Sequence, residues 1–366
     1  MKRKRIPQSD AAYAPEAHLQ WWYFDAAFDD GHRLLTYFLP GFKGRIENQG
    51  LDEPFLNVVL KRPDGTIIRE PRSFPPSEFF PRTGEFGARF GEDCSATFEK
   101  GTAEDDLGRY ILKANAGRLG YELILTPDAP PWSPFGPPAQ IPRWGMMLAR
   151  RSISTRDYFH YAPFVPRGRM EGRMVLDGES FDVRGTGYHE QGRFSFPLYE
   201  FTEAWYWLHI DHHPWTILTG TGVHPPGLLK PKKETRGGFA YVAKEGRRLL
   251  ATADISGLLV NWQRIDKHAP QPGAEMNMAW NTDVRLSRRG LLVQAKVLST
   301  EVLECMPFFY HEETPVTPYW SQSIAKADVS IRQGTSRVEF EAECVLETMV
   351  SGETGKLRPN RGLNRV

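Results

Sequence analysis

The sequence predicts a mainly β protein built from two antiparallel barrel or sandwich domains, and three observations support this. Aromatic residues make up 12% of the chain, alongside 33 Gly and 29 Pro, a mixture that favours strands and turns over helices. Short apolar runs recur with turn residues between them. No segment shows helical periodicity or the strand and helix alternation of a parallel sheet. With 366 residues the chain exceeds the roughly 250 to 300 that one core supports, which predicts two domains.

Four hairpins follow from pairs of apolar runs that flank a Gly-containing turn. The pairs are 22–28 and 34–38 around Asp29–Gly31, 56–60 and 66–68 around Pro63–Gly65, 173–176 and 180–183 around Asp177–Gly178, and 284–286 and 291–297 around Arg288–Gly290. The only helical signal is a short turn near Pro76–Phe80. Each half of the chain is therefore expected to be an up-and-down barrel or a sandwich.

Composition and charge exclude several classes of protein. The 46 Lys and Arg nearly balance the 45 Asp and Glu, so no strong field attracts nucleic acid. No window approaches the ~18 apolar residues of a membrane span, and the N-terminus has no signal-peptide core. Three widely spaced Cys fit free thiols in a reducing compartment. We expect a cytoplasmic protein without a nucleic-acid partner, and peripheral membrane contact stays open.

The common catalytic motifs are missing from the sequence. It has no GxSxG elbow, P-loop, HExxH or dinucleotide GxGxxG, which disfavours hydrolase, phosphoryl-transfer and nicotinamide chemistry. His209, Asp211, His212 and His213 supply ligand types without zinc-type spacing. We therefore expect neither a metal nor a cofactor.

Two segments resemble a known family. The first runs from His18 through Trp21–Ala26 (WWYFDA); the second runs from Phe159-His160-Tyr161 to Gly185–Glu190 (GTGYHE), followed by Trp205-Tyr206-Trp207. Their order and spacing resemble the carotenoid 1,2-hydratase (hydroxyneurosporene synthase) and AttH-like family, to which the lipocalin-like Diels-Alderases are related. The resemblance implies two lipocalin-like barrels side by side.

In domain terms, residues 15–192 are expected to form the N-terminal barrel, which contains both signature segments, and residues 193–366 the C-terminal one. The proposed acid of the family's hydratases is an Asp, to which Glu190 corresponds by position only, with a side chain longer by one methylene. Two departures stand out: Gln20 replaces the family's Glu before the tryptophan pair, and Gln191-Gly192-Arg193 replaces the His-Asn-Trp that follows the acid.

A physical case for Glu190 can be made from the residues alone. Hydrating an isolated alkene or cyclising a polyene needs a strong proton donor, and a carboxyl group kept neutral by apolar surroundings can supply it. Aromatic faces can hold the resulting cation. The predicted catalytic residues are Glu190, Tyr188 and His189, and the predicted substrate-binding residues are Trp22, Phe24, His160, Tyr161, Gln191, Trp205 and Trp207.

Side chains alternate between the two faces of a β-strand, which predicts which of these residues lie on the same side. Trp22 and Phe24 should share one face, with Trp21, Tyr23 and Asp25 on the other. The same rule places Tyr188 and Glu190 together, and it groups Trp205, Trp207, His209 and Asp211.

The leading hypothesis is a cofactor-independent enzyme for a long apolar isoprenoid or polyene, acting by acid-promoted hydration or cyclisation. A pericyclic reaction in the same pocket is the second hypothesis, and a lipid carrier without chemistry is the third. Glu190 could instead form a structural ion pair with Arg150, Arg173 or Arg184. For the aromatic residues of the first strand, ordinary core packing is favoured over a cavity lining.

Overall fold

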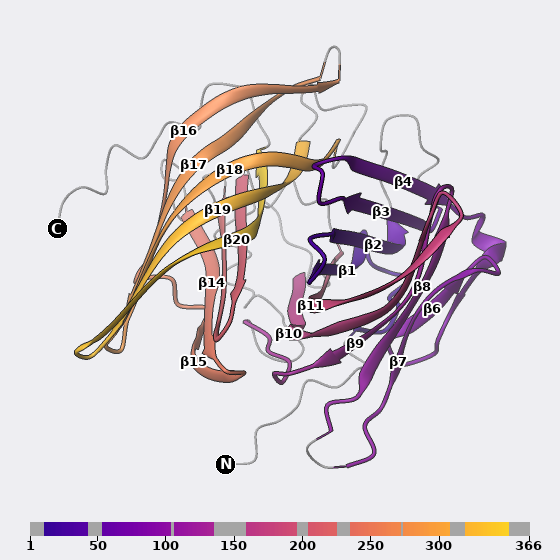
Figure 1. Cartoon of the computed structure of the whole chain (residues 1–366), viewed down its shortest axis with the longest axis horizontal. Coiled ribbons are helices and arrows are strands. Elements are labelled where there is room, and N and C mark those ends of the chain that lie inside the picture. Colours follow the sequence, from indigo (N-terminus) through magenta and orange to yellow (C-terminus); the bar gives the residue numbers. More distant parts are fainter. Residues whose placement is uncertain are drawn as a thin grey trace. The chain divides into compact units, whose positions relative to one another are not determined.

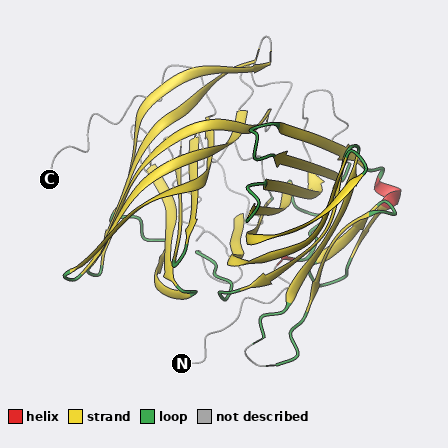
Figure 2. Cartoon of the chain, viewed as in Figure 1, coloured by secondary structure: helices red, strands yellow, loops and turns green. Residues whose placement is uncertain are grey.

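The computed structural model describes residues 11–42, 53–103, 106–134, 159–195, 204–224, 235–271, 274–307 and 319–350. These residues are nearly all β-strand, with one short 3-10 helix, η2 (Pro76–Glu78), as Figure 2 shows. Residues 11–195 of the described part belong to one compact unit and residues 204–350 to a second. The predicted fold class is confirmed. No helix in the described part of the chain is long and apolar enough to cross a membrane.

Unit 1 is a single antiparallel sheet of 11 strands in the described residues, in the order β4-β3-β2-β1-β11-β10-β9-β8-β7-β6-β5. Its strands are β1 (Leu19–Phe28), β2 (Arg33–Phe42), β3 (Phe55–Lys61), β4 (Ile67–Ser73), β5 (Phe79–Pro81), β6 (Gly87–Phe90), β7 (Cys94–Glu99), β8 (Arg109–Ala116), β9 (Leu119–Pro127), β10 (Phe159–Leu176) and β11 (Glu179–Phe194).

Unit 2 is an antiparallel sheet of nine strands, in the order β15-β14-β13-β12-β20-β19-β18-β17-β16. Its strands are β12 (Ala204–His212), β13 (Trp215–His224), β14 (Thr235–Lys244), β15 (Arg247–Thr252), β16 (Leu258–Gln271), β17 (Ala274–Arg288), β18 (Leu291–Pro307), β19 (Tyr319–Gln333) and β20 (Ser336–Val350). Figure 1 shows how strongly the strands of each unit curl.

The connection between the two edge strands forces the sheet of unit 1 to curl. Strands β4 and β5 are neighbours in sequence but lie at opposite edges of the sheet, joined only by residues 74–78. Such a segment spans at most about 20 Å, whereas 11 flat strands would be about 48 Å wide. Unit 2 repeats this arrangement, because residues 253–257 connect its edge strands β15 and β16. The two edges of each sheet must therefore come close together.

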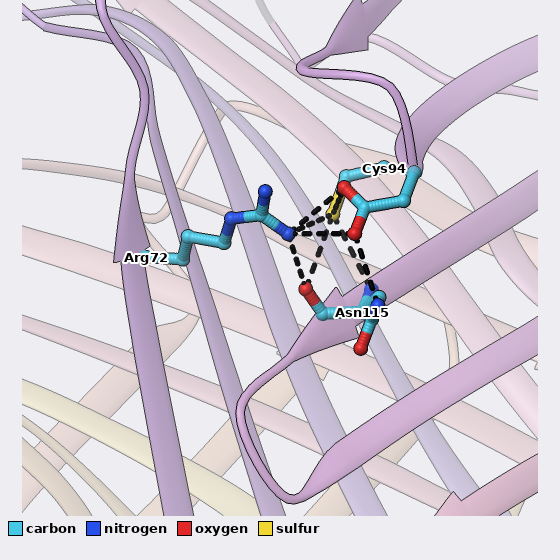
Figure 3. Close-up of polar contacts among 4 residues, drawn as sticks. Arg72, Cys94 and Asn115 are labelled. Atoms are coloured by element: carbon cyan, nitrogen blue, oxygen red, sulfur yellow. Dashed lines mark hydrogen bonds and ion pairs between the residues drawn. The ribbon is translucent and has the colours of Figure 1, made fainter.

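Arg72 on the edge strand β4 stabilises the curled sheet of unit 1 through hydrogen bonds to residues near the opposite edge (Figure 3). Its Nη1 donates to Asp93 Oδ1 at 2.8 Å and to the carbonyl of Asn115 at 2.6 Å. The Asn115 side chain donates to Asp93 Oδ2 at 3.0 Å, and the Cys94 thiol lies in the same cluster. One guanidinium thus links β4 to the start of β7 and the end of β8.

The predicted hairpin turns occur where expected. Asp177 and Gly178 between β10 and β11 both have positive φ (52° and 85°), as do Arg289 and Gly290 between β17 and β18 (51° and 78°). Two successive residues with positive φ match the right-handed twist of the paired strands. All three cysteines, Cys94, Cys305 and Cys344, are free thiols, as predicted.

Because Arg72 bridges strands that share no backbone ladder, Arg72→Met is expected to destabilise unit 1 by about 1 kcal/mol, the range for a part-exposed charged pair with added hydrogen bonds. Urea unfolding followed by tryptophan fluorescence measures the change. Arg173→Met is the control, since Arg173 pairs with Asp182 at 3.3 Å and both side chains are exposed. Equal midpoints for the two variants would show that Arg72 does not fasten the closure.

Candidate active site

The pairing of the first strand of unit 1 with its last strand assembles a polar group on one face of the sheet. In the register of β1 and β11, Tyr23 lies opposite Glu190 and Asp25 opposite Tyr188. Residues directly opposite in an antiparallel pair project to the same side. Tyr161 on β10 pairs with Gly192 and joins this face. We call Trp21, Tyr161, Tyr188 and Glu190 the acid cluster.

Three donors surround the Glu190 carboxyl group. The Tyr188 hydroxyl donates to Oε2 at 2.6 Å, and the Tyr161 hydroxyl makes a short hydrogen bond to the same oxygen. The indole Nε1 of Trp21 donates to Oε1 at 3.1 Å. The two tyrosine hydroxyls lie 3.1 Å apart. The carboxyl group is thus held by neutral donors from three different strands.

Burial controls the protonation of Glu190. The residue is only 6% exposed, and burial raises the pKa of its carboxyl group from 4.5 to about 7. Hydrogen bonds from Tyr161, Tyr188 and Trp21 favour the ionised form and lower this pKa, while the charge of Asp25 raises it slightly. Near pH 7 the folded protein therefore contains both the acid and its conjugate base.

No Lys or Arg in the described residues forms an ion pair with Glu190. Two arginines considered as its structural partners pair elsewhere: Arg173 with Asp182, and Arg184 with Asp29 at 3.9 Å. Arg150 lies outside the described residues. A buried carboxyl group with a raised pKa and no paired cation is unusual for a purely structural role.

Gly192 makes room for the Trp21 indole. The six-membered ring of Trp21 lies over this glycine so closely that a Cβ there would overlap ring atoms. Because Gly192 pairs with Trp21 across the β1 and β11 ladder, any side chain at this position would displace the indole from Glu190. Trp21 and Gly192 were absent from the predicted site; the signal for Trp21 was its place on the same face as Tyr23.

The other predicted residues of unit 1 lie on the opposite face of the same strands, toward the core. The ring of His189 stacks on Phe24 with centroids 4.0 Å apart, and its Nδ1 lies 2.9 Å from the carbonyl of Tyr23. Trp22 belongs to the same core and donates to the carbonyl of Ala11 at 3.0 Å. Burial lowers the pKa of His189 to about 3, so it is a neutral core residue at pH 7.

His160 and Gln191 also lie on this inner face and contact each other through a short hydrogen bond. Burial, with the charge of Arg193, lowers the pKa of His160 to about 3. Trp205 and Trp207 are on β12 in unit 2. The structure thus brings Glu190, Tyr188 and Tyr161 together, and it places His189, Trp22, Phe24, His160 and Gln191 away from the carboxyl group.

The Pro-rich segment after β9 packs against β10 where it is described. The Trp132 side chain is buried, and its backbone N–H donates to the carbonyl of Pro163 at 3.0 Å. Pro163 pairs with Glu190 in the sheet. The described part of this loop therefore supports the strand next to the acid cluster.

No protein-family model and no curated protein matches this sequence. Solved structures do match along most of both chains. A Nitrosomonas europaea protein provisionally named AttH (NE1406) has a TM-score of 0.59 at 15% identity, covering 96% of this chain and 98% of that chain. CghA, solved with Sch210972, has a TM-score of 0.61 at 10% identity, covering 94% of each chain.

Kievitone hydratase from Nectria haematococca is similar too, with a TM-score of 0.54 at 10% identity, covering 95% of this chain and 93% of that chain. Identities this low establish the fold and nothing further. The predicted resemblance to AttH-like proteins is therefore confirmed at the level of the fold.

Glu190→Gln should change how stability depends on pH. The pKa of Glu190 is raised in the folded protein, so its contribution to stability is fully present below pH 4.5 and is lost as pH rises through about 7. Relative to the variant, the wild type should lose up to about 3 kcal/mol between pH 5 and pH 8, at 1.36 kcal/mol per pKa unit. His160 and His189 are common to both proteins and cancel. Urea unfolding across this range measures the difference, and a constant difference would contradict the raised pKa.

Gly192→Ala should displace the Trp21 indole and remove one donor that favours the ionised carboxyl. The pKa of Glu190, obtained from the midpoint of the same stability difference, is then expected to rise, and Trp21→Phe should raise it by the same amount. Both substitutions break the same hydrogen bond, from Trp21 to Glu190. The double variant should therefore show no further rise in the pKa of Glu190. Additive shifts would mean that Gly192 does not act through Trp21.

Proposed function

We propose that this protein is a cofactor-independent enzyme that acts on a long apolar isoprenoid or polyene by acid-promoted hydration or cyclisation of a C=C bond. The observation that carries the proposal is Glu190: a buried carboxyl group with a pKa of about 7 and no paired cation among the described residues. General acids work best when their pKa lies near the working pH.

The hydrogen bonds indicate where the transferable proton sits. Oε2 already accepts from Tyr161 and Tyr188, whereas Oε1 accepts only from Trp21. A carboxyl oxygen offers two lone-pair directions, so Oε1 keeps one for the acidic proton. Glu190 Oε1 is therefore the atom that delivers the proton.

Proton transfer breaks the O–H bond of Glu190 and uses the π electrons of the alkene to form a new C–H bond, which leaves a carbocation and a carboxylate. The donors of the acid cluster stabilise this carboxylate, since hydrogen bonds to charged acceptors are the stronger ones. In hydration, water then adds to the cation, and the proton it loses returns to the Glu190 carboxylate. In cyclisation a second C=C bond attacks the cation, and the carboxylate takes a proton from a carbon next to the new cationic centre.

Aromatic rings beside the carboxyl group suit a cationic intermediate. Tyr23 shares the face of Glu190, with its ring 4.7 Å from that of Tyr37 and 6.0 Å from that of Tyr188. Ring faces attract a cation without capturing it. His189 has no part in this scheme, because it packs among the rings on the core face. The likeness to a structure named kievitone hydratase supports hydration as the first choice.

A pericyclic reaction is the second candidate function. The hydroxyls of Tyr161 and Tyr188 and the indole N–H of Trp21 converge on one point and could polarise a carbonyl group of a folded substrate. Such a reaction would use the donors of the acid cluster and would transfer no proton from Glu190 to carbon.

Incubation with a panel of isoprenoid polyenes in D2O separates these functions. Acid-promoted hydration or cyclisation must place deuterium on carbon, which mass spectrometry detects, whereas a cycloaddition product contains none and a carrier gives no product. Glu190→Gln should lower the rate at least ~10²-fold while substrate binding persists. Asp182→Asn, which removes an exposed carboxylate from the same strand, should retain activity. Products free of carbon-bound deuterium would overturn the proposal.

The rate should also follow the protonation of Glu190. The reactive form is the neutral acid, so kcat is expected to fall as pH rises through about 7, the pKa of Glu190. Trp21→Phe should move this decline to higher pH, since it removes a donor that lowers the pKa. A profile that is flat from pH 5 to pH 9 would exclude Glu190 as the acid.

A further inference from the structure

Unit 2 repeats the strand arrangement that creates the acid cluster in unit 1. In both units the first strand pairs with the last: β1 with β11, and β12 with β20. Near the end of each last strand a glutamate lies opposite an aromatic residue, Glu190 opposite Tyr23 and Glu347 opposite Trp207. Tyr206 and Leu208 belong to the core of unit 2, so Trp207 and Glu347 project from the other face.

A glutamine on the neighbouring strand completes a polar group around Glu347. Gln322 on β19 pairs with Glu347 and donates from Nε2 to Glu347 Oε2 at 2.9 Å. On its other side Gln322 pairs with Glu304 of β18, whose side chain is also buried. We call Trp207, Glu304, Gln322 and Glu347 the amide cluster.

The carbonyl oxygen of Gln322 is an unused acceptor. Gln322 is fully buried at 0% exposure, and its Oε1 has no hydrogen-bond partner. The orientation of the amide is fixed, because a carboxylate accepts only and the nitrogen must face Glu347. Buried polar atoms are nearly always paired, so an unpaired one needs an explanation.

The surroundings of the amide cluster are aromatic. Trp207 and His209 lie on the same face of β12 with ring centroids 5.9 Å apart, and both are buried. Trp320, on the strand of Gln322, shares this face because it pairs with Met349 two positions from Glu347. Indole rings on the same face of the sheet as an unpaired acceptor suit an apolar body that carries one polar group.

We propose that the amide cluster is a second binding site, for a neutral small molecule with an N–H or O–H donor on an apolar body. The donor group would satisfy Gln322 Oε1, with the Glu347 carboxyl as the adjacent acceptor, and the indole rings would contact the apolar part. A primary amide or an alcohol meets this requirement, whereas an ether or a tertiary amide does not. The site is independent of proton transfer at Glu190.

Two matched probes test the site in the full chain. Decanamide presents two N–H donors, and N,N-dimethyldecanamide presents none on nearly the same body. We expect decanamide to bind about 3- to 10-fold more tightly, the effect of one hydrogen bond to a neutral buried acceptor. In protein labelled with 5-fluorotryptophan, decanamide should shift the ¹⁹F resonance of Trp207, assigned with Trp207→Phe.

Gln322→Leu should abolish the preference for decanamide, because the variant keeps the volume and loses the acceptor. The control is Ser321→Ala, which alters the adjacent residue on the core face and should keep the preference. If Gln322→Leu does not fold, Gln322→Asn serves, since its shorter side chain withdraws the acceptor while staying polar. Equal affinity of the wild type for the two probes, or a preference that persists in the Gln322 variant, would overturn the proposal. So would a preference abolished by Tyr188→Phe, which would place the probe at the acid cluster.

Discussion

The pairing of the first strand with the last in each unit is the constraint on which the rest of this structure depends. It joins segments far apart in the chain, and the short connections between the edge strands make each sheet curl around its own core. The ladder of β1 and β11 brings Trp21 to Glu190 across 169 positions of sequence. Without that ladder the carboxyl group would lose its indole donor and the strand that buries it. The acid cluster is thus a product of topology rather than of any local motif.

Burial has different effects on the protonation of side chains on the two faces of β1, β10 and β11. On the core face, burial keeps His160 and His189 neutral, with pKa values of about 3; His189 stacks on Phe24, and His160 is hydrogen-bonded to Gln191. On the other face, burial raises the pKa of Glu190, and three donors restrain the rise so that it stops at about 7. Burial alone would favour a permanently neutral acid, and the donors alone would favour a permanent carboxylate. Their balance gives a group that can both release and regain a proton.

Much of the fold could be predicted from local chemistry. The hairpins at Asp177-Gly178 and around Arg288–Gly290 were predicted from a Gly-containing turn between two apolar runs, and both turns occur there. Period-two alternation placed Tyr188 with Glu190 and separated Trp22 from Trp21, as the register shows. The same rule separates His189 from Glu190, because neighbours in a strand face opposite sides.

What the sequence could not indicate depends on long-range register. The ladder of β10 and β11 has irregularities between Pro163 and Gly168 that no local pattern indicates, so the pairing of Tyr161 with Gly192 could not be predicted. The match of Trp21 with Gly192 requires knowing that β1 pairs with β11, which no local pattern reveals. The closure through Arg72 is equally non-local, since its partners lie on strands that follow in the chain and meet β4 only when the sheet curls.

The proposed chemistry requires Glu190 to be a neutral acid in part of the folded population at pH 7. Infrared difference spectroscopy of the wild type against Glu190→Gln tests it directly, by following the carbonyl stretch of the protonated carboxyl group as pH is varied in the folded protein. This band should disappear with a midpoint near 7, the pKa of the buried group. A midpoint near the ordinary glutamate value of 4.5 would show that Glu190 is a carboxylate at neutral pH and cannot be the proton donor.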